Sequence, residues 1–335
     1  MRQRSSGLYA SVQVRVTVKS VERAEALDFA KVALRNAGFD VSRTCASRAS
    51  CFDFAARKGE TLVFVKVAHN IRDVSRSDAA ELRTVAVCFN GSLLIVSDVN
   101  GEEALSNDTI YSRYGAHVVT SKTLEDIVHG THPLIEATPG GFYVRTDGGK
   151  IRERRHELGL SIGKLALMVG VSRRALYGYE MEMTRASVAA AYQLAETLGV
   201  PIAKSINILE ANPDSQDTFS MDNHQNNDGG NRIRNHILAK FSKFGLNVYA
   251  TNRSPFDFAA FCPHTELRII GGILSEDDGR SDDRAEEITS LSKVMEAKSV
   301  LLGNGDSANN HEVAFLSYDE LEKIPDRQKL EALLR

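Results

Sequence analysis

Two adjacent arginines, Arg173 and Arg174, have the residue type and the placement to contact nucleic acid. They begin an amphipathic stretch, residues 173–180, that predicts a short helix. A guanidinium can bind O6 and N7 of a guanine in bidentate fashion, and it can equally pair with a phosphate. The sequence leaves both roles open for each arginine. Tyr177, one turn later, suits a thymine methyl group, a phosphate or a solvated surface position.

Three further polar residues are candidates for contacts with the phosphate backbone: Ser161, Lys164 and Ser172. Each serine stands just before a predicted helix, where its hydroxyl accepts a hydrogen bond from a backbone N–H without a helical partner. Such contacts position a protein on DNA without specifying the base sequence. With the arginines and Tyr177, they form the surface expected to bind double-stranded DNA.

The residues between these side chains have the types that hold two crossing helices together. Residues 160–180 read LSIGKLALMVGVSRRALYGYE. Ala166 is small where two helices would cross closely, and Gly170 suits the left-handed backbone of a sharp turn. Val171 and Leu176 are spaced to face a core. The pattern predicts a helix-turn-helix whose second helix lies in the major groove.

The neighbouring segments predict three further helices, so that residues 150–210 form an all-α five-helix bundle. A basic helix over residues 150–158 precedes the turn. Ser187 caps an amphipathic helix that Gly199 ends. The last predicted helix has its apolar face on Ile202, Ile206 and Leu209.

This segment resembles the lambda repressor/Cro type of helix-turn-helix domain. The resemblance implies a structural ion pair between Arg155 on the first helix and Glu180 at the end of the recognition helix. Ile162 departs from the pattern, because repressors of this type often carry a phosphate-clamping Gln there. Met181 and Glu182 likewise replace small or basic residues. The alternative is an ordinary amphipathic bundle.

A second set of residues resembles part of the nuclease site of the restriction-endonuclease-like fold. Asp53 and Lys66 have the spacing of the Asp that binds Mg²⁺ and the Lys that orients the attacking water, but Phe64 occupies the Glu position. One carboxylate is too few for a hard divalent cation. Glu60 is the alternative source of a second carboxylate, at a shifted position, but a surface residue is the better explanation for it. We therefore expect no catalytic residue and no metal, and a structural role for Asp53 in bonding backbone N–H groups.

The regions on either side of the helix-turn-helix repeat each other, in six segments at an offset of about 205 residues. CFDFAA at 51–56 recurs as PFDFAA at 255–260, and SDAAEL at 77–82 recurs as DRAEEI at 283–288. Strands alternate with helices in both copies, which predicts two duplicated small α/β domains. The nuclease-like positions of the second copy read Asp257, Ile269 and Gly271.

This order of segments, with the run SRRALYGYEMEMTRASVAAAYQLAETLG, resembles the archaeal family of HTH-type transcriptional regulatory proteins. The expected multi-domain order is a basic arm (1–20), an α/β domain (21–130), a connector with a short strand (131–149), the helix-turn-helix domain (150–210), a flexible linker (211–231) and the second α/β domain (232–335).

Charge and composition narrow the classes of function. The net charge is −3, but residues 1–20 carry +4 and residues 131–210 carry +2, so a nucleic-acid surface belongs to the arm or the middle segment. The sequence has no 18-residue apolar run, no secretory signal, no paired-cysteine metal motif and no nucleotide-binding loop. We expect a cytoplasmic protein without a cofactor and without membrane contact.

These observations favour a sequence-specific DNA-binding transcriptional regulator rather than an enzyme. The α/β domains would provide dimerisation or ligand sensing, and we expect a homodimer; pairing of the two copies within one chain, leaving a monomer, is the alternative. A divergent nuclease targeted by the helix-turn-helix and an RNA- or ribosome-associated factor are the rival functions. Two adjacent arginines suit a DNA major groove better than the deep groove of RNA.

Overall fold

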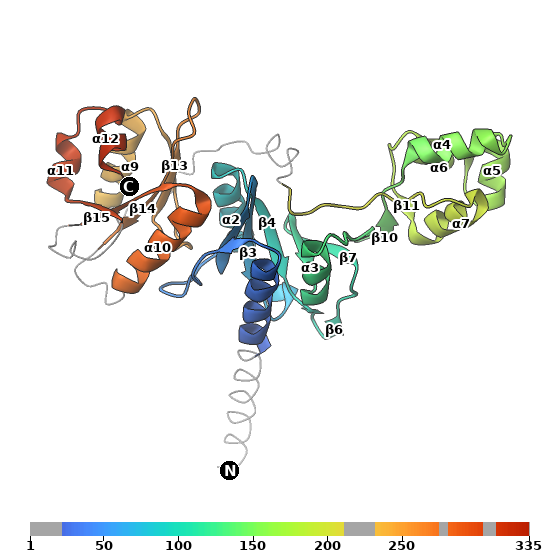
Figure 1. Cartoon of the computed structure of the whole chain (residues 1–335), viewed down its shortest axis with the longest axis horizontal. Helices are drawn as coiled ribbons and strands as arrows, with labels where there is room; N and C mark the ends of the chain where they lie inside the picture. The colour runs from blue at the N-terminus through green and yellow to red at the C-terminus, as the bar shows by residue number, and fades with distance from the viewer. Residues whose placement is uncertain (1–21, 211–231, 275–280, 304–312, 335) are drawn as a thin grey trace, which may run out of the picture.

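The computed structural model describes residues 22–210, 232–274, 281–303 and 313–334. Three parts follow one another along the chain (Figure 1): the first α/β unit (22–130), the helix-turn-helix segment (131–210) and the second α/β unit (232–334). The expected basic arm (1–20) and flexible linker (211–231) lie outside the described residues.

The first α/β unit is a mixed sheet with helices on both faces. Its helices are one over residues 22–36, α2 (Arg76–Cys88) and α3 (Ser121–Val128), with a 3-10 turn η1 (Ile71–Asp73). Its main strands are β1 (Asp40–Val41), β2 (Phe54–Lys58), β3 (Thr61–Val67), β4 (Ser92–Val96), β7 (Thr109–Arg113) and β8 (Ala116–Val119). A separate hairpin pairs β5 (Val99–Asn100) with β6 (Glu103–Ala104).

The apolar composition of the central strands explains this layering. β3 reads TLVFVKV and is buried along most of its length, as expected for a strand covered on both faces. The helix over residues 22–36 and α3 pack on one face, and α2 packs on the other. Strands β1, β2 and β3 pair antiparallel, and β3, β4 and β8 pair parallel.

The second α/β unit has the same strand order and the same strand directions. Its sheet runs β12 (Asn247–Ala250), β13 (Phe258–Phe261), β14 (Arg268–Ile273), β15 (Lys298–Leu302) and β16 (Ala314–Leu316). The first two pairings are antiparallel and the last two are parallel. Its helices are α9 (Arg232–Lys243), α10 (Ser281–Met295), α11 (Tyr318–Lys323) and α12 (Arg327–Leu333).

The strand register shows that two residues of the second unit were assigned wrongly to the nuclease-like positions. Phe54 pairs with Val65 in the first unit, and the equivalent Phe258 pairs with Gly271 in the second. Phe64 and Lys66 therefore correspond to Ile270 and Gly272, not to Ile269 and Gly271. The shift arises because the second hairpin has one residue more than the sequence comparison assumed.

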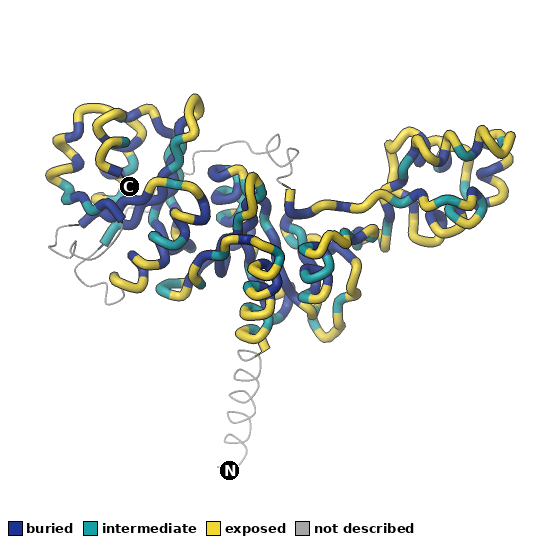
Figure 2. Tube along the Cα trace, viewed as in Figure 1, coloured by how far each residue is buried: buried dark blue, intermediate teal, exposed yellow. Residues whose placement is uncertain are grey.

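The two α/β units share one hydrophobic cluster, in addition to the separate core that each has on its other face. Side chains of α2, β2 and β3 and side chains of α10, β13 and β14 belong to the same buried cluster. The rings of Phe52 and Phe256 have centroids 6.4 Å apart across the junction. Figure 1 shows the second unit directly against the first, and Figure 2 shows buried strands in both. The structure thus pairs the two units within one chain, the alternative that the sequence left open.

The helix-turn-helix segment extends the first sheet and adds four helices. Strand β9 (Ile135–Thr138) continues from β7, and β10 (Gly141–Val144) and β11 (Ala186–Ser187) follow, giving a nine-stranded sheet. The helices are α4 (Gly148–Glu157), α5 (Ile162–Val169), α6 (Arg173–Glu180) and α7 (Val188–Leu198). β10 occupies the place of the short strand expected in the connector.

The prediction of a fifth helix after Gly199 is wrong. Gly199 ends α7 with a left-handed backbone, φ 67°, and Pro201 has no N–H to donate to a helix. The chain instead runs back beside the segment that enters the domain. Three backbone hydrogen bonds join the two segments: Asp147 N to Ile202 O, Lys204 N to Arg145 O, and Ile206 N to Pro133 O. Ile206 and Leu209 reach the core of the first α/β unit.

Within the described ranges, no helix is both long enough and apolar enough to cross a membrane.

Candidate nucleic-acid interface

Capping residues define the turn between α5 and α6. The Ser161 hydroxyl accepts a hydrogen bond from the Lys164 amide at 3.1 Å and begins α5. Gly170 ends α5 with φ 75°, a left-handed conformation that is unfavourable for residues with a side chain. The Ser172 hydroxyl accepts from the Ala175 amide at 3.0 Å and begins α6. These local bonds fix the angle at which α6 leaves the turn.

The six residues expected to contact DNA are all exposed: Ser161, Lys164, Ser172, Arg173, Arg174 and Tyr177. They come from the first turns of α5 and α6 and from the middle of α6. On the opposite side of α6, Leu176 and Tyr179 are buried in the core of the domain. The N-termini of α5 and α6 also expose backbone N–H groups and carry partial positive charge, which favours phosphate.

Gly163 makes room for Arg173. A Cβ atom added at Gly163 would lie 2.8 Å from the Nε atom of Arg173, so the guanidinium of Arg173 lies alongside α5. Sequence reasoning missed this glycine. The signal was available, because glycine inside a helix costs about 1 kcal/mol relative to alanine and its presence there needs a packing reason.

Arg155 and Glu180 form a bidentate ion pair between α4 and α6. Arg155 Nε lies 2.6 Å from Glu180 Oε1, and Arg155 Nη2 lies 3.1 Å from Glu180 Oε2. Both side chains are buried, with 7% and 3% of their surface exposed. The hydrogen bonds that Arg155 donates to Glu180 raise the pKa of Arg155. Arg155 also donates to the carbonyl of Leu160, so it joins α4, α6 and the loop that leads to α5.

The residues after α6 are held by a second set of contacts. Glu182 has a left-handed backbone, φ 55°, and its carboxylate accepts the Gly148 amide at 3.1 Å and the Lys204 ammonium at 2.6 Å. Hydrogen bonding from Lys204 lowers the pKa of Glu182. Ile162, at the position of the phosphate-clamping Gln, packs against the domain core. The departures from the repressor pattern at Ile162 and Glu182 are therefore explained by packing and by an ion pair.

A buried carboxylate that sequence reasoning missed lies at the base of the domain. Glu136 on β9 is 2.6 Å from Arg145 and 2.7 Å from Arg185, which follows the turn after α6. Burial lowers the pKa of the neighbouring His117 on β8, while Glu136 opposes this shift. These residues come from four different segments of the chain, and no spacing rule connects them.

In the first α/β unit, Asp53 bonds to the backbone and to basic side chains. Its Oδ2 atom accepts the Val67 amide at 2.7 Å, and its Oδ1 atom lies 2.6 Å from Arg23. Lys66 donates to the carbonyl of Ser50 at 2.6 Å and lies 3.5 Å from Asp53. Phe64 is fully buried among aromatic rings. Glu60 is exposed in the turn between β2 and β3.

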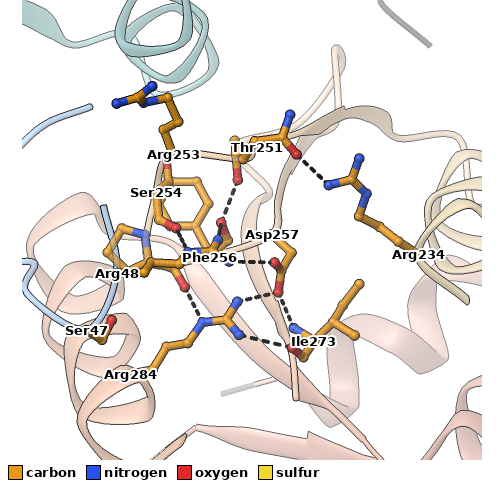
Figure 3. Close-up of polar contacts among 12 residues, drawn as sticks. Ser47, Arg48, Arg234, Thr251, Arg253, Ser254, Phe256, Asp257, Ile273 and Arg284 are labelled. Atoms are coloured by element: carbon orange, nitrogen blue, oxygen red, sulfur yellow. Dashed lines mark hydrogen bonds and ion pairs between the residues drawn. The ribbon is translucent and has the colours of Figure 1, made fainter. Parts of the chain in front are cut away.

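In the second α/β unit, two arginines surround the equivalent Asp257 (Figure 3). Asp257 accepts the Ile273 amide, which matches the bond from Val67 to Asp53. Arg284 of α10 pairs with Oδ2, and Arg48 of the first unit lies 2.9 Å from Oδ1. Among the described residues, no three His, Cys, Asp or Glu side chains are grouped to hold a metal ion.

Two family models match parts of the chain. Residues 23–133 match the family model of the PD-(D/E)XK superfamily domain, and residues 151–204 match the helix-turn-helix model. The solved structure of the restriction-modification controller protein C.AhdI from Aeromonas hydrophila is 32% identical over 16% of this chain and 80% of its own, with a TM-score of 0.15.

Several curated proteins are similar over almost the whole chain. Three of them carry the name "Putative HTH-type transcriptional regulatory protein". The protein from Methanococcoides burtonii is 33% identical over 90% of this chain and 93% of its own length. That from Methanocaldococcus jannaschii is 29% identical over 89% and 92%, and that from Pyrococcus horikoshii is 30% identical over 94% and 98%. The chain belongs to this archaeal family of HTH-type transcriptional regulatory proteins.

Proposed function

We propose that the protein is a sequence-specific DNA-binding transcriptional regulator that places α6 in the major groove. The observation that carries the proposal is the exposed face of α6, on which Arg173, Arg174 and Tyr177 lie beside the two helix N-termini. Base edges would be read by the arginines, and Ser161, Lys164 and Ser172 would contact phosphates. The names of the relatives support the same function.

The test is a binding titration on the best duplex selected from a random library. Arg173→Ala together with Arg174→Ala should weaken binding to that duplex by about 2–6 kcal/mol and relax the preference at the contacted base pairs, because each good bidentate contact contributes about 1–3 kcal/mol. Lys164→Ala is the matched control. It should weaken all duplexes alike and reduce the salt slope by about one unit. Unchanged affinity of the double variant would reject α6 as the reader.

We infer that the nuclease-like units do not cleave DNA. Asp53 already accepts a backbone amide and an arginine, and Phe64 supplies no carboxylate at the second metal-binding position. Plasmid and linear duplex should stay intact with Mg²⁺ or Mn²⁺, and Phe64→Glu should add at most weak metal binding. Cleavage that disappears in folded Asp53→Ala protein would instead favour the divergent nuclease, the second candidate function.

We also infer that the two α/β units are copies of one ancestral unit, with the boundaries expected from the sequence. Equal strand order and the matching bonds of Asp53 and Asp257 support the duplication. A sensing role for the pair stays a prediction. The expected homodimer needs a surface other than the one where the two units meet. Binding to a DNA duplex in preference to RNA of the same sequence is the test against the RNA- or ribosome-associated alternative.

A further inference from the structure

The two α/β units meet through reciprocal contacts of the loops that precede Asp53 and Asp257. Each loop begins in the same way: the Cys45 amide donates to the carbonyl of Asp53, and the Thr251 amide donates to that of Asp257. The next two residues of each loop turn their amides toward a helix of the other unit. The loops therefore stand in equivalent places on both sides of the junction.

Two glutamates at equivalent helix positions receive these amides. Glu81 of α2 accepts from Asn252 N at 3.1 Å and from Arg253 N at 2.6 Å. Glu287 of α10 accepts from the amides of Ala46 and Ser47, both at 2.7 Å. Glu81 and Glu287 are the fifth residues of the matching segments SDAAEL and DRAEEI. The junction thus has approximate two-fold symmetry in its hydrogen bonds.

Arginines also cross the junction in both directions. Arg48 of the first unit pairs with Asp257 of the second and donates to the carbonyls of Ser254 and Phe256 (Figure 3). Arg253 of the second unit lies 2.6 Å from Asp78 on α2. The helices also cross the junction reciprocally: α10 of the second unit packs on β2 of the first, and α2 of the first unit packs on β13 of the second.

Contact of one surface with its own equivalent is the geometry of an isologous dimer. Here both partners are in the same chain, where covalent connection through residues 211–231 gives the second unit an effective concentration of about millimolar. A second chain at micromolar concentration cannot compete for this surface. The α/β surface that would dimerise two chains is already occupied, and the described part of the chain carries one recognition helix for the pair.

We propose that the α/β pair is a built-in dimer and that the chain binds a single, non-palindromic DNA site as a monomer. The inference rests on the proposed function, because it specifies the class of duplex that α6 reads. Symmetric regulators place two recognition helices about 34 Å apart and so require an inverted repeat. One chain with one recognition helix has no such requirement.

Selection of bound duplexes from a random library, using the full chain at micromolar concentration, tests this proposal. We expect an enriched motif without inverted symmetry, and a complex whose mass by light scattering corresponds to one chain per duplex. An inverted repeat bound by two chains would overturn it; in that case exposed apolar side chains of the helix-turn-helix segment, such as Leu167 and Met183, would be the surface to examine. Absence of any enriched motif would instead reject the proposed function.

A second measurement tests the junction without DNA. A protease site introduced into residues 211–231 allows the purified full chain to be cut between the units. The two pieces should elute together in gel filtration at micromolar concentration, with the mass of one chain, because the shared core and the reciprocal bonds remain. Separation of the pieces, or a mass of two chains before cutting, would contradict a built-in dimer.

Discussion

Arg155 and Glu180 show how much a single side-chain pair contributes to the placement of the recognition helix. The pair is almost without solvent contact, and it joins α4 to the last turn of α6. A Cβ at Gly148 would lie 2.2 Å from the carbonyl oxygen of Glu180, so the first turn of α4 also lies directly against the end of α6. The direction of α6 therefore depends on contacts at the end opposite to its arginines.

Glu180→Gln should lower the free energy of unfolding of the helix-turn-helix segment by about 3 kcal/mol, because it leaves the charge of Arg155 buried without its counter-charge. Glu182→Gln is the matched control. Its partner Lys204 is exposed and the loss should be below about 1 kcal/mol. Urea denaturation followed by circular dichroism measures both. Equal losses for the two variants would contradict the argument from burial.

Burial of His117 predicts a pH dependence. Its pKa is lowered in the folded chain, while the unfolded chain has the ordinary value of about 6.5. The unfolded state therefore takes up a proton first as the pH falls, and stability decreases below about pH 6.5. His117→Gln should flatten this decrease between pH 7 and 5.5 in denaturant titrations. The same slope in both proteins would show that other groups cause it.

At the scale of elements, the turn between α5 and α6 is the segment most dependent on one backbone conformation. Gly170→Ala should destabilise the segment by about 1–2 kcal/mol, because φ 75° places an alanine Cβ too close to the neighbouring carbonyl oxygen. Gly170→Asn should cost less, since asparagine tolerates the left-handed region. Thermal melts of the two variants check the order, and an Ala variant at least as stable as the Asn variant would refute it.

The sequence predicts elements well where the signal is local. Ser161, Gly170 and Ser172 stand at the ends of α5 and α6, as capping rules require. The prediction of the fifth helix was wrong, although Ile202 and Ile206 have helical spacing. Pro201 and the pairing with the entering segment favour an extended chain there. Local periodicity contains no information on a partner segment that lies 55 or more positions away along the chain.

The contacts between the units could not have been predicted from spacing. Glu81 and Glu287 read as ordinary surface glutamates on amphipathic helices, and their acceptor role depends on loops about 170 and 240 positions distant. The internal repeat was visible in the sequence as similarity between segments. Similarity shows that two units share a fold, but whether they pair with each other depends on surfaces that assemble only after folding.

On the scale of the whole molecule, the shared cluster predicts how the chain unfolds. The two α/β units should melt together in one calorimetric transition, and the helix-turn-helix segment, with its own core, in another. Glu287→Ala removes the carboxylate that accepts from the part-buried amides of Ala46 and Ser47, and it should lower the free energy of unfolding in the α/β transition by about 1 kcal/mol. Separate transitions for the two α/β units would contradict a common core.

The segments that enter and leave the helix-turn-helix region lie side by side, with Thr146 bridged to Ala203. An insertion whose two ends adjoin can be lengthened, shortened or replaced without separating the strands that receive it. The helix-turn-helix region can therefore be replaced as a unit during evolution. Related proteins can acquire new target sequences in this way while the α/β pair and its junction stay unchanged.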